Sequence, residues 1–248
     1  MLISAHQLNY LPYAGYFAKI IKSDAFMFIQ KVQFEKKSWQ NRNKILTKNG
    51  IVMLSVPVLS KDKFSQNIEE VRINNDTPWR SKHFKSIVLA YNKTPFFKRY
   101  IEFFEDIYQK EWEFLKDIDY AITLFFINEL GIKTPLYYDK DFDLRGKKND
   151  LLIDICKALK ADTYLSNEGS ADYVDINYLN AHHIEHYFCR YTEQTPPPLQ
   201  QHTLPQQDKT MYLSMIDMLF NKGAQQSKMI LENSLELSEK NSLLKEIK

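Results

Sequence analysis

The chain has 248 residues, 44% of them hydrophobic and 26% charged, so it is long enough to bury a substantial core. The formal net charge at pH 7 is only +2, and basic and acidic residues are mixed along the chain, which argues against a nucleic-acid-binding protein. Cys156 and Cys189 lie in apolar patterns, which indicates buried reduced thiols and excludes a disulfide framework. Without a signal-like start or an apolar run of roughly 20 residues, we expect a cytoplasmic protein that does not insert into membranes.

The first elements predict two parallel strands joined by a helix. Strands are expected at residues 2–4 and 25–29, with an amphipathic helix between them. Such a unit is right-handed and places its strands in parallel. Residues 32–45 have few aliphatic side chains and are expected to form an irregular loop, whereas residues 51–58 and 68–73 are expected to be the third and fourth strands.

Apolar residues recur at helical spacing after Pro78, which predicts three helices. Pro95 separates the first two, and the third, at residues 115–130, ends at Gly131, a residue type favoured just after a helix. Together they form a predicted helical layer at about residues 79–130. The aromatic side chains in this layer are interpreted as core residues and not as a cofactor site.

The remaining elements alternate between short strands and helices. In chain order we expect a strand at 134–138, a helix at 150–159 with Asn149 as its N-cap, a short strand at 163–166 and an edge strand at 184–191. Consecutive prolines make 195–198 an extended connector, and a last packed helix at 211–221 stops at Gly223. The polar stretch that follows is expected to be a peripheral helix or partly disordered.

This order of elements predicts an α/β fold with a mostly parallel sheet flanked by helices. We expect one domain over residues 1–223, with residues 79–130 as a helical insertion and residues 224–248 as a peripheral tail. The oligomeric state cannot be predicted from these patterns.

The first candidate site is the turn after the first strand. His6, Asn9 and Tyr10 are candidate catalytic residues, and Gln7 is a candidate substrate-binding residue. Ligands of α/β proteins bind at the carboxyl ends of strands, a histidine can accept a proton near neutral pH, and amide side chains can orient a polar substrate. The alternative is that these side chains only satisfy backbone groups of a tight turn.

A second candidate site lies in the polar segment at residues 32–45. The candidate substrate-binding residues are Gln33, Trp39, Asn41, Arg42 and Asn43. A guanidinium suits a carboxylate or phosphate, an indole offers a stacking face, and amides give directional hydrogen bonds. The segment therefore predicts a site for an anionic ligand, with a solvated loop as the alternative.

A third candidate site is the start of the first helix after Pro78, where Trp79, Lys82 and His83 could bind a substrate. A cation in the first helical turn opposes the helix dipole, so Lys82 suggests an anionic partner. No metal site is expected at the three histidines within residues 182–186, because their strand-like surroundings separate the side chains.

The two N-terminal segments resemble the paired signature of the WbqC-like family. They read HQLNYLPYAGYFAKI at residues 6–20 and VQFEKKSWQNRNKI at residues 32–45, and similar blocks continue to about Gly223. Two positions differ from the usual pattern, with Leu8 where the family has proline and Asn167 where it has glycine. The resemblance implies an enzyme of bacterial O-antigen or other surface polysaccharide biosynthesis.

The same resemblance implies transfer of a glycyl, other aminoacyl or acyl group to the amine of a nucleotide-linked amino sugar. We expect His6 to deprotonate this amine, Asn9 and Gln33 to orient it, and Arg42 with Lys82 or His83 to hold anionic substrate groups. The sequence requires no cofactor. The donor is either an acyl or aminoacyl thioester, which would involve a carrier protein, or a carboxylate activated by ATP.

Two alternatives remain. A short part of the N-terminal half also resembles nucleotidyltransferase-like adenylating ligases of the pantothenate synthetase kind, which predicts an ATP-dependent amide ligase, although the usual second histidine of the turn is missing. A non-catalytic glycan or nucleotide-sugar binding module would use the same polar turn and the numerous aromatic residues, because aromatic rings suit stacking against ligands.

Overall fold

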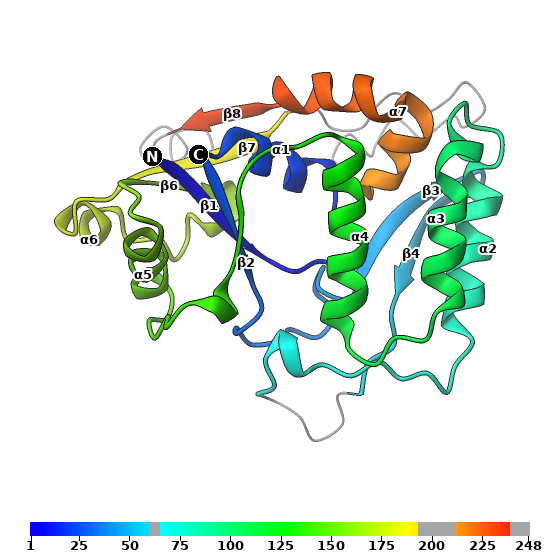
Figure 1. Ribbon diagram of the computed structural model, residues 1–248, viewed down its shortest axis with the longest axis horizontal. Helices are drawn as coiled ribbons and strands as arrows, with labels where there is room; N and C mark the ends of the chain where they lie inside the picture. The colour runs from blue at the N-terminus through cyan, green and yellow to red at the C-terminus, as the bar shows by residue number, and fades with distance from the viewer. Residues whose placement is uncertain (60–64, 193–211, 239–248) are drawn as a thin grey trace.

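The computed structural model describes residues 1–59, 65–192 and 212–238 (Figure 1). Within these ranges six strands form one sheet in the order β5-β2-β1-β6-β7-β8. They are β1 (Leu2–Gln7), β2 (Ala25–Ile29), β5 (Leu136–Tyr138), β6 (Thr163–Asn167), β7 (Glu185–Tyr191) and β8 (Leu235–Ser238). All neighbouring strands pair in parallel except β7 and β8, which are antiparallel. This confirms the α/β fold with a mostly parallel sheet.

Seven α-helices surround this sheet in the described part of the chain. They are α1 (Ala14–Lys22), α2 (Trp79–Tyr91), α3 (Phe97–Gln109), α4 (Leu115–Glu129), α5 (Asn149–Leu159), α6 (Ile176–Ala181) and α7 (Met215–Glu232). One core cluster joins one face of the sheet to α1, α4 and α7 and continues into α2 and α3. A second cluster lies on the opposite face, against α5 and α6. The alternation of side chains along a strand explains why β1 contributes Ile3 and Ala5 to the second cluster only.

The helical layer at residues 79–130 is confirmed. Its three helices α2, α3 and α4 occupy the expected segments, and Gly131 follows α4 with a φ of +60°. A positive φ strains most side chains, so a glycine is well suited to this helix end. The expected helix at 150–159 is α5, which begins one residue earlier, and the expected strands at 134–138 and 163–166 are β5 and β6.

The segment at residues 32–58 differs from the expectation. Part of the expected loop is the strand β3 (Arg42–Thr47), which pairs in antiparallel fashion with β4 (Gly50–Ser55) in a separate two-stranded sheet. Gly50 has a φ of +107° and permits the tight turn between them. Figure 1 shows this hairpin beside α2 and α3, far from α5 and α6. The expected strand at 68–73 is instead a 3₁₀ turn, Ile68–Glu70, followed by isolated bridges.

More of the C-terminal part packs into the sheet and its helices than the sequence predicted. The last helix does not stop at Gly223, because α7 continues to Glu232 across a kink where Gly223 has a φ of +72°. Residues 235–238 then form β8 at the edge of the sheet, so β7 is an interior strand and the expected peripheral tail is wrong for this stretch. The predicted connector at 195–198 and the first residue of the predicted helix at 211–221 lie outside the described residues.

Candidate functional site

A large cavity lies where the strand order of the sheet reverses direction. From β1 the chain builds outward through β2 and β5 on one side, and then through β6 and β7 on the other. Loops leave the carboxyl ends of β1 and β6 in opposite directions at such a point, which opens a crevice for ligands. A cavity of about 930 Å³ occupies this position and is lined by the ends of β1, β6 and β7. Its location follows from the topology and not from any single motif.

His6 lies near the end of β1 and lines this cavity. Its Nδ1 is 2.9 Å from the backbone oxygen of Gln7, and its ring meets that of Tyr16 edge-on at 4.9 Å. A carbonyl can only accept, so Nδ1 carries the proton and Nε2 carries the lone pair. Burial, and secondarily the ammonium of Lys19, lowers the pKa of His6 to about 3. The imidazole is therefore neutral at physiological pH.

Four further residues predicted as site residues line the same cavity: Gln7, Asn9, Trp39 and Asn43. The Oε1 of Gln7 accepts a 2.6 Å hydrogen bond from Gln40 Nε2, which joins the histidine turn to the tryptophan segment. Asn43, a residue of β3, donates from Nδ2 to the backbone oxygen of Leu11 at 2.6 Å and so ties β3 to the histidine turn. Trp39 is 43% exposed, and Lys44 Nζ lies over its ring at 5.5 Å from the ring centre. The structure therefore brings parts of the first two candidate sites together.

Other members of the predicted anion site lie elsewhere. The cavity lining does not include Gln33, Asn41, Arg42 or Lys82. Asn41 Nδ2 donates to the backbone oxygen of Val56 at 2.9 Å, and Gln33 forms an isolated bridge with Asn67. Lys82 is exposed on α2. For Arg42 the reason is tertiary, because β3 is half of a hairpin that presents only some of its side chains to the cavity.

Tyr10 and His83 form a separate buried cluster outside the cavity lining. The hydroxyl of Tyr10 is 2.8 Å from His83 Nδ1 and 2.5 Å from the hydroxyl of Tyr108. Burial lowers the pKa of His83 to about 4, so this imidazole is also neutral at physiological pH. The contacts link the N-terminal turn to α2 and α3, which is a structural role for both residues.

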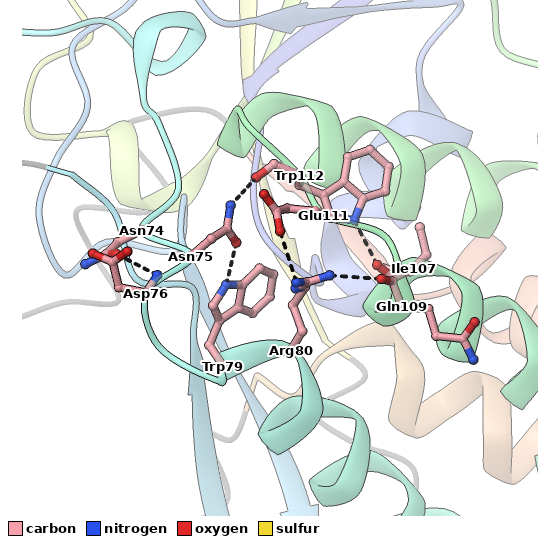
Figure 2. Close-up of polar contacts among 9 residues, drawn as sticks. All are labelled: Asn74, Asn75, Asp76, Trp79, Arg80, Ile107, Gln109, Glu111 and Trp112. Atoms are coloured by element: carbon pink, nitrogen blue, oxygen red, sulfur yellow. Dashed lines mark hydrogen bonds and ion pairs between the residues drawn. The ribbon is translucent and has the colours of Figure 1, made fainter.

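Trp79 anchors the start of α2 (Figure 2). Its Nε1 donates a 3.2 Å hydrogen bond to Asn75 Oδ1, and Asn75 Nδ2 donates to the backbone oxygen of Trp112 at 2.9 Å. Trp112 in turn donates from Nε1 to the backbone oxygen of Ile107 at 2.8 Å. The indole of Trp79 is buried and does not line the cavity. The hydrogen bond to Asn75 and the burial of the indole therefore give Trp79 a structural role at the start of α2.

Of the three histidines at residues 182–186, only His186 lies in a strand, so the strand-like interpretation does not extend to His182 and His183. His182 and His183 follow the end of α6, whereas His186 lies within β7. The Nε2 of His186 is 2.8 Å from the buried hydroxyl of Ser166. His186 therefore belongs to the interior of the sheet.

Several cavity residues were not predicted from the sequence. Lys19 of α1 is one of them, and its Nζ donates a 3.1 Å hydrogen bond to the backbone oxygen of Ala5. Glu168 and Arg190 face each other as a two-point ion pair, with distances of 2.9 and 2.8 Å. The arginine holds the pKa of Glu168 below its usual range. A lysine within the apolar helix sequence AGYFAKIIK was the available signal for Lys19.

Aromatic rings form another part of the lining. Tyr13, at the start of α1, meets Tyr191 edge-on at 6.1 Å and Tyr212 at 5.3 Å. Gly15 makes this packing possible, because a Cβ there would lie 2.4 Å from Tyr13 Cε2 and 2.9 Å from Tyr191 Cβ. The cavity thus combines polar strand ends with a wall of tyrosines.

Of the two positions at which the chain departs from the family pattern that it resembles, Asn167 lines the cavity and Leu8 is buried in the core. The backbone N–H of Leu8 donates to the oxygen of Ile29 at 3.3 Å, a hydrogen bond that proline cannot make. Asn167 has a φ of −71°, which any residue can adopt, and it lines the cavity. Both substitutions are therefore compatible with the local backbone.

Comparison with known proteins gives three findings. Residues 7–229 match the WbqC-like protein family. The chain is 31% identical over 170 residues to the uncharacterized protein Rv1507c of Mycobacterium tuberculosis, a match that covers 68% of this chain and 73% of that protein. No solved structure matches.

None of the helices in the described ranges is long and apolar enough to cross a lipid bilayer.

Proposed function

This chain belongs to the WbqC-like protein family, and we propose that it is a cytosolic enzyme of bacterial surface polysaccharide biosynthesis. The proposed reaction transfers a glycyl, other aminoacyl or acyl group to the amine of a nucleotide-linked amino sugar. The observation that carries this proposal is a neutral histidine, His6, which lines a large cavity at the switch point of the sheet and whose Nδ1, not Nε2, contacts the Gln7 oxygen. Such a group can accept a proton from an attacking amine.

The remaining side chains have distinct roles in this reaction. The amides of Gln7 and Asn9 line the cavity next to His6 and can orient the amine by hydrogen bonds. Trp39, at 43% exposure, offers an indole face for the base or sugar of the nucleotide. Tyr10, Gln33, Arg42, Lys82 and His83 take no part in the chemistry of this proposal, because none of them lines the cavity.

The low pKa of His6 sets a condition on the mechanism. An imidazole with a pKa of about 3 is a weak base, and a general base works best when its pKa is close to the working pH. Negative charge on a bound substrate favours the imidazolium and raises this pKa. An anionic substrate in the cavity therefore moves the pKa of His6 towards the working pH.

A second function is favoured by the aromatic lining. Tyr13, Tyr212 and the exposed face of Trp39 are all cavity residues, and rings of this kind stack against sugars and bases. A non-catalytic module that binds a nucleotide sugar would need these rings but would not need His6. Removing the imidazole of His6 therefore distinguishes the two functions: the transferase would lose its activity, whereas the binding module would keep its ligand.

The test is a transfer assay with purified protein. Glycine, ATP and a set of amino-sugar nucleotides are supplied, with glycyl thioester as a second donor, and amide product and AMP are measured by mass spectrometry. Amide formation that depends on His6 supports the transferase. Binding of the nucleotide sugar without amide, AMP or hydrolysis products from any donor contradicts it and favours the binding module.

A further inference from the structure

Lys19 is a buried cation that lacks a negative partner among the residues described. The residue is 1% exposed and is one of those that line the cavity. The single hydrogen bond of this ammonium is donated to the backbone oxygen of Ala5 at 3.1 Å. None of the ion pairs between described residues includes Lys19. An ammonium has three N–H donors, so two are left for other acceptors.

The position of this lysine in its helix does not explain its burial. Lys19 and Lys22 both lie in the last turn of α1, where a cation is favoured by the helix dipole. Lys22 gains that interaction while its side chain stays exposed. Burying an ammonium is costly unless a negative group compensates its charge. The burial of Lys19 therefore needs a reason beyond α1 itself.

The other basic residues that line the cavity are either paired with a carboxylate or exposed to solvent. Arg190 is held by Glu168 through two hydrogen bonds of 2.9 and 2.8 Å. Lys148, which precedes α5, is exposed to solvent. Burial lowers the pKa of Lys19 to about 8, so its ammonium form still dominates at neutral pH. The Cys189 thiol interacts electrostatically with Lys19, but burial raises the pKa of this thiol, so it carries no negative charge at neutral pH. Among the residues described, the cavity thus contains one buried positive charge that no carboxylate pairs with.

We propose that Lys19 binds an anionic oxygen group of the substrate, a carboxylate or a phosphoryl group, in the buried part of the cavity. This takes the place of the anion site that the sequence located at Arg42. The inference deepens the proposed function and rests on it for the identity of the cavity as the active site. It also explains how a substrate activates His6, because an anion beside Lys19 cancels a positive charge that disfavours the imidazolium.

The test measures anion binding without turnover. Acetate, glycine, inorganic phosphate, pyrophosphate and uridine diphosphate are titrated by calorimetry into wild type, Lys19→Met and Lys22→Met. Methionine keeps the length and apolar contacts of the lysine stem but removes its charge. We expect at least one anion to bind about tenfold or more weakly to Lys19→Met, since a hydrogen bond to a charged group is lost. Lys22→Met should bind within about twofold of wild type, since Lys22 is exposed outside the cavity lining.

A second measurement covers the case in which Lys19→Met fails to fold. Wild-type protein labelled with ¹⁵N-lysine is titrated with the same salts, and the ammonium resonance of Lys19 is followed. A saturable shift of this resonance supports the site, and the active anion identifies the source as carboxylate, phosphate or nucleotide. If every anion leaves the Lys19 resonance and all binding constants unchanged, the proposal is wrong. Such a failure leaves the transfer assay of the proposed function undecided, so the two proposals fail separately.

Discussion

The Nδ1 of His6 lies 2.9 Å from the backbone oxygen of Gln7, and this hydrogen bond fixes the imidazole tautomer. Replacing His6 with glutamine removes the Nε2 lone pair but keeps a polar side chain of similar reach. We expect turnover to fall by roughly 10²- to 10⁴-fold, the usual contribution of a general base. Binding of the amino-sugar nucleotide, measured by calorimetry, should change by much less.

Tyr10→Phe is the matched control for this prediction. Tyr10 belongs to the same turn, but its hydroxyl contacts His83 and Tyr108 outside the cavity lining. The variant should keep turnover while losing about 1 kcal/mol or more of unfolding free energy, because a buried hydrogen bond is removed. Full activity in His6→Gln would exclude His6 from the reaction.

Lys19 and His6 are also coupled electrostatically. Lys19→Met should raise the pKa of His6 above about 3, because the lysine ammonium disfavours the imidazolium. The pKa should stay below its usual value near 6.5, since burial is the larger cause and is unchanged. An NMR titration of the His6 ring protons measures both values. Lys22→Met serves as the control, and an identical His6 titration in all three proteins would contradict the coupling.

Folding stability should depend on pH through two neutral histidines, the partly buried His6 and the buried His83. The pKa values of His6 and His83 are lowered to about 3 and about 4, whereas both titrate near 6.5 in the unfolded chain. Between these limits the unfolded state binds more protons, so the unfolding free energy falls as the pH is lowered from about 6.5 towards 4. Each histidine contributes a slope of at most about 1.4 kcal/mol per pH unit.

Urea unfolding of variants measured from pH 7 to pH 4 separates these contributions. His83→Gln should lower stability at pH 7, because Tyr10 loses one of its two hydrogen-bond partners, but should also flatten the pH dependence. His183→Asn is the control, since His183 is exposed and asparagine tolerates its φ of +60°. An unchanged slope in His83→Gln would show that this histidine is charged or solvated in the folded state.

Gly15 allows Tyr13 and Tyr191 to approach each other at the cavity wall. Gly15→Ala would place a Cβ 2.9 Å from Tyr191 Cβ, an atom that cannot move without its backbone. We expect a loss of about 1–3 kcal/mol of unfolding free energy, as for other overpacked sites, together with weaker ligand binding. Gly169→Ala is the control in the same cavity, because a Cβ there meets no atom within 4 Å. Equal stability of the two variants would contradict this packing.

The parts of the fold that the sequence predicted well are those with a strong local pattern. Helices α2, α3 and α4 bury one face at regular spacing, and Gly131 ends the last of them. His6 could be placed at a ligand-binding edge because a strand, a helix and a parallel strand follow one another within the first thirty residues. That inference needs only the order of these three elements along the chain and the handedness of the connection between the two strands.

The errors arose where pairing between distant segments decides the structure. Strand β3 begins with Arg42, Asn43 and Lys44, so its polar sequence hides the alternation of a strand. Only the hairpin with β4 shows that Asn43 faces the cavity while Arg42 does not. Lys19 was missed because a lysine in an amphipathic helix is usually solvated. Its burial depends on how α1 lies against the sheet, which no local pattern reveals.

The pairing of β8 has a consequence for how this protein is made. Leu235, Glu236 and Leu237 pair with Tyr191, Arg190 and Cys189, three residues of the cavity wall. During translation the ribosome adds β8 after every other described strand, so the nascent chain carries β7 with an open edge until then. Unpaired edges invite association with other chains. Substrate binding and protection from aggregation should therefore both arise late in synthesis, at the same folding step.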